Sequence, residues 1–220
     1  MNKLLTILLL SLFTIMKPYA QAIEIIDKPI IFNEERKELS LQYIEQHYGI
    51  KQDSAFITPK VIVIHWTVIP TMEKTFEVFN TPKLATHREA IIDASSLNVS
   101  AHFLVDRDGT IYRLMPEHYF ARHVIGLNHC AIGIENVADG NDLPLTKAQF
   151  EANKKLVEYL TNKHPIEYLI GHDQYKQFIG TPLWKELDPN YLTEKSDVGE
   201  VFINRLHSQI SPKLKPAPGL

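Results

Sequence analysis

The sequence predicts a single α/β domain in which helices flank a central mixed β-sheet. Three observations predict this fold. Residues 61–66 form a nearly continuous β-branched run, typical of a strand that is covered on both faces. Two apolar segments, 101–105 and 110–114, flank Asp106-Arg-Asp-Gly109, a hairpin turn in which Gly109 can adopt a positive φ. Helical patterns lie between the strands, and the hairpin makes the sheet mixed rather than purely parallel.

The other elements follow from the same signals. Two further apolar runs, 131–137 and 166–170, predict strands. Thr146 and Gln149 have the spacing of a capping box at the start of a helix whose apolar face continues to Leu160. Three more helices are expected over residues 34–48, 72–79 and 198–210.

The first 22 residues have the pattern of a secretory signal peptide. Lys3 supplies the positive charge, and the apolar run 4–16 is shorter than the ~20 residues that span a bilayer. Ala20 and Ala22 have the spacing that a signal peptidase recognises. We therefore expect cleavage near Ile23, with no stable membrane anchor afterwards. A retained anchor is the weaker alternative, and the segment has no cysteine that could carry a lipid.

Residues 23–210 contain no repeat or linker and are expected to form one domain. The tail 211–220 has three prolines and a glycine, which predicts disorder. Cys130 is the one cysteine of the chain, so no internal disulfide can form, and we expect a small buried hydrophobic residue at this position.

The charge of the chain argues against one class of partner. Without residues 1–22, 21 basic side chains face 26 acidic ones, a net charge of −5. Nucleic-acid binding depends on clustered Lys and Arg, so we expect no nucleic-acid partner. The signal peptide predicts an exported protein, periplasmic or secreted, and we expect it to be a monomer.

Two of the ten histidines follow apolar strands. His65 and His172 each stand where a strand ends and side chains converge on a cleft. Either alone is compatible with a hydrogen-bonded core histidine, but together they suggest two imidazole ligands of zinc, which needs a third protein ligand and an open position for catalysis. Five others lie among charged residues and are expected at the surface: His47, His87, His118, His164 and His207.

Position in the sequence does not select the third ligand. Asp173, Asp188 and Asp197 all follow His172, and the Cys130 thiolate is a formal competitor. Glu135 is also conspicuous, because it lies inside an apolar strand. Burying an unpaired charge costs several kcal/mol, so Glu135 should face a polar cleft, a cation or a metal-bound water. The alternative is a solvent-exposed glutamate on an edge strand.

Six motifs, in order between residues 58 and 206, carry a family resemblance. They are Val61-Ile-Val-Ile-His-Trp-Thr67, Asn98-Val-Ser-Ala-His-Phe-Leu-Val-Asp-Arg-Asp-Gly-Thr-Ile-Tyr112, Ala121-Arg-His-Val-Ile-Gly126, Ala131-Ile-Gly-Ile-Glu-Asn136, Gly171-His172 and Lys195-Ser-Asp-Val-Gly199. With these motifs the chain resembles the zinc-dependent N-acetylmuramoyl-L-alanine amidases of the amidase_2 type, relatives of the peptidoglycan recognition proteins. The resemblance implies the amidase/peptidoglycan-recognition-protein-like fold.

The resemblance also implies roles for particular residues. It implies one zinc ion per chain, bound by His65, His172 and Asp197, with Glu135 and Lys195 as catalytic residues. Two departures from the family pattern are visible. Val198 replaces the usual proline, and the stretch 174–194 is long, so Asp188 stays open as the alternative third ligand.

The substrate that the resemblance implies is peptidoglycan or its muropeptides. The amide bond between N-acetylmuramic acid and L-alanine would be hydrolysed, in cell-wall turnover or remodelling. Four residues in family-like segments are expected to bind substrate, Arg122 through the carboxylates of the stem peptide: His102, Arg122, His123 and Asn128. For each of the four, the alternative is a structural hydrogen bond or one that supports a metal ligand.

Two other functions compete with this interpretation. Some relatives bind peptidoglycan without cutting it and lack metal ligands, whereas all the candidate ligands and catalytic residues are present here. The protein could also be an exported antibacterial amidase. A cleavable signal peptide without a wall-binding repeat favours an enzyme that acts in the periplasm of its own cell.

Overall fold

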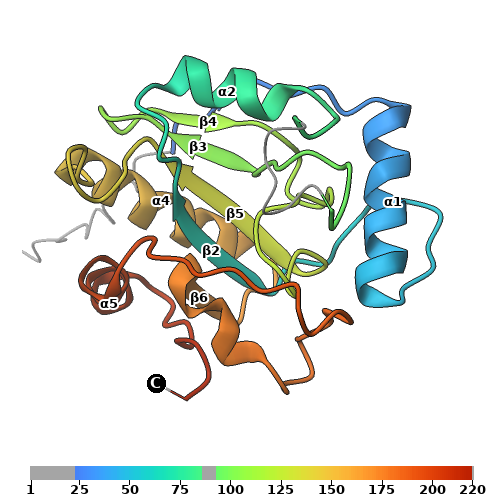
Figure 1. Cartoon of the computed structure of the whole chain (residues 1–220). Helices are drawn as coiled ribbons and strands as arrows, with labels where there is room; N and C mark the ends of the chain where they lie inside the picture. The colour runs from blue at the N-terminus through green and yellow to red at the C-terminus, as the bar shows by residue number, and fades with distance from the viewer. Residues whose placement is uncertain (1–22, 86–92, 220) are drawn as a thin grey trace, which may run out of the picture.

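The computed structural model describes residues 23–85 and 93–219, and its centre is a six-stranded sheet (Figure 1). The strands lie in the order β1-β4-β3-β5-β2-β6. The β3–β4 pair is antiparallel and the other pairs are parallel, which confirms the predicted mixed sheet. The strands are β1 (Ile26–Asp27), β2 (Val61–Trp66), β3 (Phe103–Val105), β4 (Ile111–Arg113), β5 (Ala131–Asn136) and β6 (Tyr168–Gly171).

Helices cover both faces of the sheet. Side chains of α4 and α5 pack on the face formed by Ile62 and Ile64 of β2. Side chains of α1 and several loops pack on the opposite face, against Val61 and Val63. Figure 1 accordingly shows α1 on one side of the sheet and α4 with α5 on the other. The helices are α1 (Glu34–Tyr48), α2 (Met72–Asn80), α4 (Lys147–Lys163), α5 (Glu200–Gln209) and the 3-10 helix η1 (His172–Phe178).

Local capping explains where the helices begin. The Asn33 side chain accepts a hydrogen bond from the Arg36 N–H at the start of α1 (3.1 Å), and Gly49 ends that helix with a φ of 65°. At α4, the Thr146 hydroxyl accepts from the Gln149 N–H, while the Gln149 side chain accepts from the Thr146 N–H (both 3.0 Å). The capping box that the sequence predicts is therefore confirmed.

The C-terminal tail differs from the expectation of disorder. Lys215 pairs with the edge strand β6: its N–H donates to the Glu167 carbonyl (2.9 Å), and its carbonyl accepts from the Leu169 N–H (3.1 Å). Ala217 is buried. An edge strand has unpaired backbone groups and tolerates proline nearby, so a proline-containing segment can still pair with it. The tail therefore contacts the sheet edge at Lys215 rather than hanging free of the domain.

His47 corrects a second expectation, because it is buried rather than at the surface. Its Nδ1 lies 2.8 Å from Glu186 Oε1, and its Nε2 lies 2.9 Å from the Ala94 carbonyl oxygen. The long segment 174–194 covers this part of α1, which the local sequence around His47 does not reveal. His118 is exposed as expected, and His164 and His207 are partly exposed, whereas His87 lies outside the described residues.

Two remaining expectations concern the ends and the cysteine. The predicted signal peptide, residues 1–22, lies outside the described residues. Within the part of the chain that the structure describes, no helix has the length and apolar character needed to cross a bilayer. Cys130 is a buried free thiol, as predicted, and burial raises its pKa to about 12.

Candidate active site

The register of three neighbouring strands brings the candidate residues to one edge of the sheet. His65 of β2 is paired with Glu135 of β5. Ile64 is paired with Gly171, the last residue of β6. The residues that follow these two in the chain, His65 and His172, therefore lie side by side. Alternate residues of a strand share a face, which puts His65 on the α1 side with Val63. The carboxyl ends of these parallel strands are where ligand sites form in α/β sheets.

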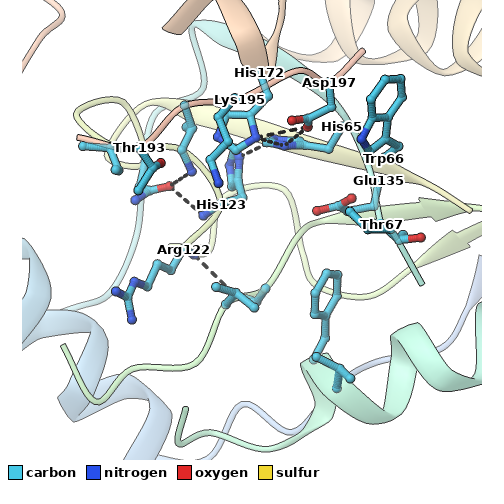
Figure 2. Close-up of a pocket in the computed structure, with 18 of the residues that line it drawn as sticks. His65, Trp66, Thr67, Arg122, His123, Glu135, His172, Thr193, Lys195 and Asp197 are labelled. Atoms are coloured by element: carbon cyan, nitrogen blue, oxygen red, sulfur yellow. Dashed lines mark hydrogen bonds and ion pairs between the residues drawn. The ribbon is translucent and has the colours of Figure 1, made fainter. Parts of the chain in front are cut away.

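His65, His172 and Asp197 form a compact cluster, and their side chains point toward one another in Figure 2. His65 Nδ1 lies 2.9 Å from His172 Nδ1 and 3.3 Å from Asp197 Oδ2. His172 Nδ1 lies 3.1 Å from the same oxygen. Among residues 23–85 and 93–219, this is the one group of three or more His, Cys, Asp or Glu side chains with the spacing to hold a metal ion.

The donor set of this cluster fits a zinc ion. Two imidazole nitrogens and one carboxylate oxygen are typical zinc ligands, and bonds of ~2.0–2.1 Å in a tetrahedral site separate neighbouring ligand atoms by ~3.3 Å. The three separations of 2.9, 3.1 and 3.3 Å are close to this value. Burial lowers the pKa of His172 to about 4, which keeps the imidazole neutral, as metal binding requires.

The carboxylate of Asp197 stays ionised despite its burial. Burial alone would raise the pKa of Asp197, but the interactions with the neighbouring His172 and His65 side chains outweigh it and hold this pKa well below its usual value. The backbone fixes the position of the residue, because the Asp197 carbonyl accepts a hydrogen bond from the Asp173 N–H (2.7 Å). Val198, the next residue, is buried in the core beneath α5.

The other candidate third ligands do not join the cluster. Asp188 is exposed, and its carboxylate accepts a hydrogen bond from the Asn190 N–H (2.9 Å). Asp173 contributes its backbone N–H to the site rather than its carboxylate. Cys130 precedes β5 and so lies at the opposite end of that strand from Glu135. The structure therefore brings Asp197, not these three, together with His65 and His172.

A cleft of about 870 Å³ opens beside the cluster. Glu135 lines it and is 9% exposed, and Figure 2 shows its carboxylate next to Thr67, to one side of the two histidines. Lys195 is exposed and lines the same cleft near His172. Both predicted catalytic residues therefore share one cavity with the three candidate ligands.

Comparison with known protein families identifies the family of this chain. The family model described as N-acetylmuramoyl-L-alanine amidase matches residues 55–182. The chain belongs to this amidase family. The match includes His65, Glu135 and His172 but ends before Lys195 and Asp197, so the placement of these last two rests on the geometry of the cleft.

The chain is also similar to solved structures. LysC, an N-acetylmuramoyl-L-alanine amidase from Clostridium intestinale URNW, is 25% identical over 70% of this chain and 85% of its own, with a TM-score of 0.45. Human PGRP-IBETAC, solved in complex with glycosamyl muramyl pentapeptide, is 18% identical over 76% of this chain and 92% of its own, with a TM-score of 0.50. The second likeness supports the predicted fold. No curated protein matches the sequence.

Two of the predicted substrate-binding residues hold the wall of the amidase cleft in place. The Arg122 guanidinium donates from Nη1 to the Ser95 carbonyl (3.1 Å) and from Nη2 to the Tyr191 hydroxyl (2.9 Å). The Asn128 side-chain oxygen accepts hydrogen bonds from the backbone N–H groups of His123 (2.8 Å) and Val124 (2.7 Å). Both residues line the cleft, and substrate contact by them stays a prediction.

His102 does not line the cleft itself and is fully buried. Its Nε2 donates to the Tyr119 carbonyl (2.9 Å), and its Nδ1 accepts from the Gly133 N–H (3.0 Å). Both ring nitrogens are thus used in joining β5 to the loop at Tyr119. These contacts fit the structural alternative for His102, and contact with substrate stays a prediction.

Sequence reasoning missed two parts of the cleft wall. The loop after β2 contributes Thr67 and Val68, and Val68 has a φ of 57°, an uncommon conformation for a β-branched residue. Tyr191 and Thr193 of the long segment 174–194 also line the cleft. The sequence could have indicated Thr67 as a cleft residue, since it lies two residues after His65 in the same motif. For Tyr191 the local sequence offers only an aromatic residue near Lys195.

His102 makes the stability of the fold dependent on pH. Burial lowers the pKa of His102 to about 4, and a proton on Nδ1 would confront the Gly133 N–H with a second donor. Below its ordinary pKa of 6.5 the unfolded chain binds a proton that the folded chain does not. The contribution of His102 is therefore complete above pH 6.5 and is lost as the pH falls from 6.5 to about 4, by up to ~3 kcal/mol.

Urea unfolding of the wild type and His102→Asn at pH 7, 5.5 and 4.5 tests this expectation. We expect the free energy of unfolding of His102→Asn to be lower at pH 7 but to fall less steeply toward pH 4.5. All other histidines are common to both proteins, so the difference in slope isolates His102. Equal slopes would contradict the assignment.

Proposed function

We propose that the protein is a zinc-dependent amidase that hydrolyses the bond between the lactyl group of N-acetylmuramic acid and L-alanine. One observation carries this proposal: the donors of His65, His172 and Asp197 converge within 4.8 Å in a cleft that Glu135 also lines. A volume of about 870 Å³ lies in the range of cavities that enclose small-molecule ligands, which suits a muropeptide.

The reaction requires a nucleophile, a proton carrier and a partner for the negative charge that develops on the carbonyl oxygen. A zinc ion held by the three ligands would polarise the carbonyl and lower the pKa of water to ~7. Glu135, beside His65 in the sheet register, would take the proton of the attacking water and pass it to the departing nitrogen. Lys195 would place its positive charge near the carbonyl oxygen as negative charge develops there.

The substrate class is proposed as peptidoglycan or its soluble muropeptides. The human relative was solved with a muramyl pentapeptide, and we propose a ligand of the same class for this cleft. The predicted signal peptide adds the proposal that the protein acts outside the cytoplasm, periplasmic or secreted, in turnover or remodelling of the cell wall.

Digestion of purified muropeptides tests the function. The zinc-loaded protein is expected to release stem peptides that begin with L-alanine, detected by mass spectrometry, and removal of the metal with a chelator is expected to stop the release. Binding of muropeptides without release of peptide would show that the protein is a binding module rather than an enzyme. Cleavage at a different bond would refute the proposed specificity.

A further inference from the structure

The two ring nitrogens of His65 face different partners. Nδ1 faces the metal-ligand cluster, 2.9 Å from His172 Nδ1. Nε2 points the other way and lies 3.1 Å from Nδ1 of His123. The His65 and His123 rings meet edge to face, at 89° with centroids 5.1 Å apart. His123 therefore contacts the side of His65 that faces away from the proposed metal site.

The hydrogen bonds of His123 determine where the proton of His65 lies. His123 Nε2 lies 3.2 Å from the Ala131 carbonyl oxygen. A carbonyl oxygen can only accept, so the single proton of a neutral His123 ring is on Nε2, and its Nδ1 offers a lone pair. The proton of His65 must then lie on Nε2 to complete the contact. This tautomer leaves the lone pair of His65 Nδ1 directed at His172 and Asp197.

Two contacts hold His123 in place, one with its ring and one with its backbone. The ring lies against Gly133 of β5, where a Cβ atom would come within 2.8–2.9 Å of three ring atoms. The backbone N–H of His123 is fixed by the Asn128 side chain (2.8 Å). Gly133 lies two residues before Glu135 on the same strand, so one strand supports both His123 and the proposed proton carrier.

We propose that His123 is a positioning residue that orients His65 and fixes its tautomer for zinc binding, rather than a residue that binds substrate. This inference rests on the proposed function. Groups that hydrogen-bond to metal-bound histidines typically change metal affinity or activity by ~10–100-fold when they are removed. Replacing a residue that only contacts substrate would change KM and leave the zinc affinity unaltered. Measuring both quantities therefore separates a positioning role from a substrate-binding role.

The experiment measures the zinc affinity of the purified protein by competition with a chromophoric chelator. We expect His123→Phe to weaken zinc binding ~10–100-fold, because the ring shape is kept but the acceptor is lost. His123→Asn should restore most of the affinity, since its side-chain oxygen can replace Nδ1 as acceptor. His129→Phe is the matched control, because His129 packs against Tyr48 and does not line the cleft.

Two further measurements separate positioning from other roles. At saturating zinc, KM for muropeptides should be nearly unchanged in His123→Phe, and nitrogen NMR of wild-type His65 should show the Nε2–H tautomer. If His123→Phe fails to fold, Gly133→Ala tests the same contact, because it displaces the ring and should also weaken zinc binding.

Wild-type zinc affinity in a folded His123→Phe would overturn the proposal, as would unchanged zinc affinity with a raised KM. A wild-type protein that binds no zinc would refute the inference and the proposed function together. A wild-type protein that binds zinc but cleaves no muropeptide would refute only the function.

Discussion

Glu135→Ala is expected to keep one zinc ion per chain but to have an amidase activity ~10²–10⁴-fold lower than the wild type. This factor is the usual contribution of a proton-transferring group to the rate. Glu135 is not part of the ligand cluster, so removing its carboxylate leaves all three donors in place. It lies beside His65 in the strand register and lines the cleft, where a proton must move from water to the departing nitrogen.

The measurement combines kcat on muropeptides with zinc content by elemental analysis. Glu135→Gln preserves the shape of the side chain without its basicity and should lose nearly as much activity as the alanine variant. Glu77→Ala is a suitable control, because Glu77 is an exposed glutamate on α2 and does not line the cleft. Full activity in Glu135→Ala would remove this residue from the mechanism.

The parts of the fold that local patterns determine are predictable from the sequence. The strand at 61–66 and the helix at 34–48 have the predicted bounds, because β-branched runs and capping residues act within a few neighbours. Glu135 lines the cleft, as expected for a buried carboxylate in an apolar strand, which needs polar or charged neighbours.

Long-range contacts explain what the residues alone left open. Position in the sequence did not distinguish Asp173, Asp188 and Asp197. The hydrogen bond from the Asp173 N–H to the Asp197 carbonyl and the packing of Val198 with α5 place Asp197 in the cluster, and neither contact is visible in the local sequence. The family motif, rather than spacing, pointed to Asp197. His47 was placed wrongly at the surface for a similar reason, since its partner Glu186 is 139 residues away.

Asp197→Ala is expected to abolish both zinc binding and amidase activity. Two imidazoles remain in this variant, whereas catalytic zinc sites use three protein ligands. In the wild type, zinc at 100 times its dissociation constant should add ~2.7 kcal/mol to the free energy of unfolding, seen as a rise in Tm. The Tm of Asp197→Ala should be almost insensitive to zinc, because the folded variant has no site of comparable affinity.

Asp188→Ala is the matched comparison, because it removes the competing aspartate of the same C-terminal region. Asp188 is exposed and bonds to the Asn190 N–H rather than to the cluster, so its variant should keep zinc, activity and the zinc-dependent rise in Tm. Stoichiometric zinc in Asp197→Ala, combined with loss of zinc in Asp188→Ala, would move the third ligand to Asp188. That result would require the segment 174–194 to rearrange, because Tyr191, three residues after Asp188, is held by Arg122 in the cleft wall.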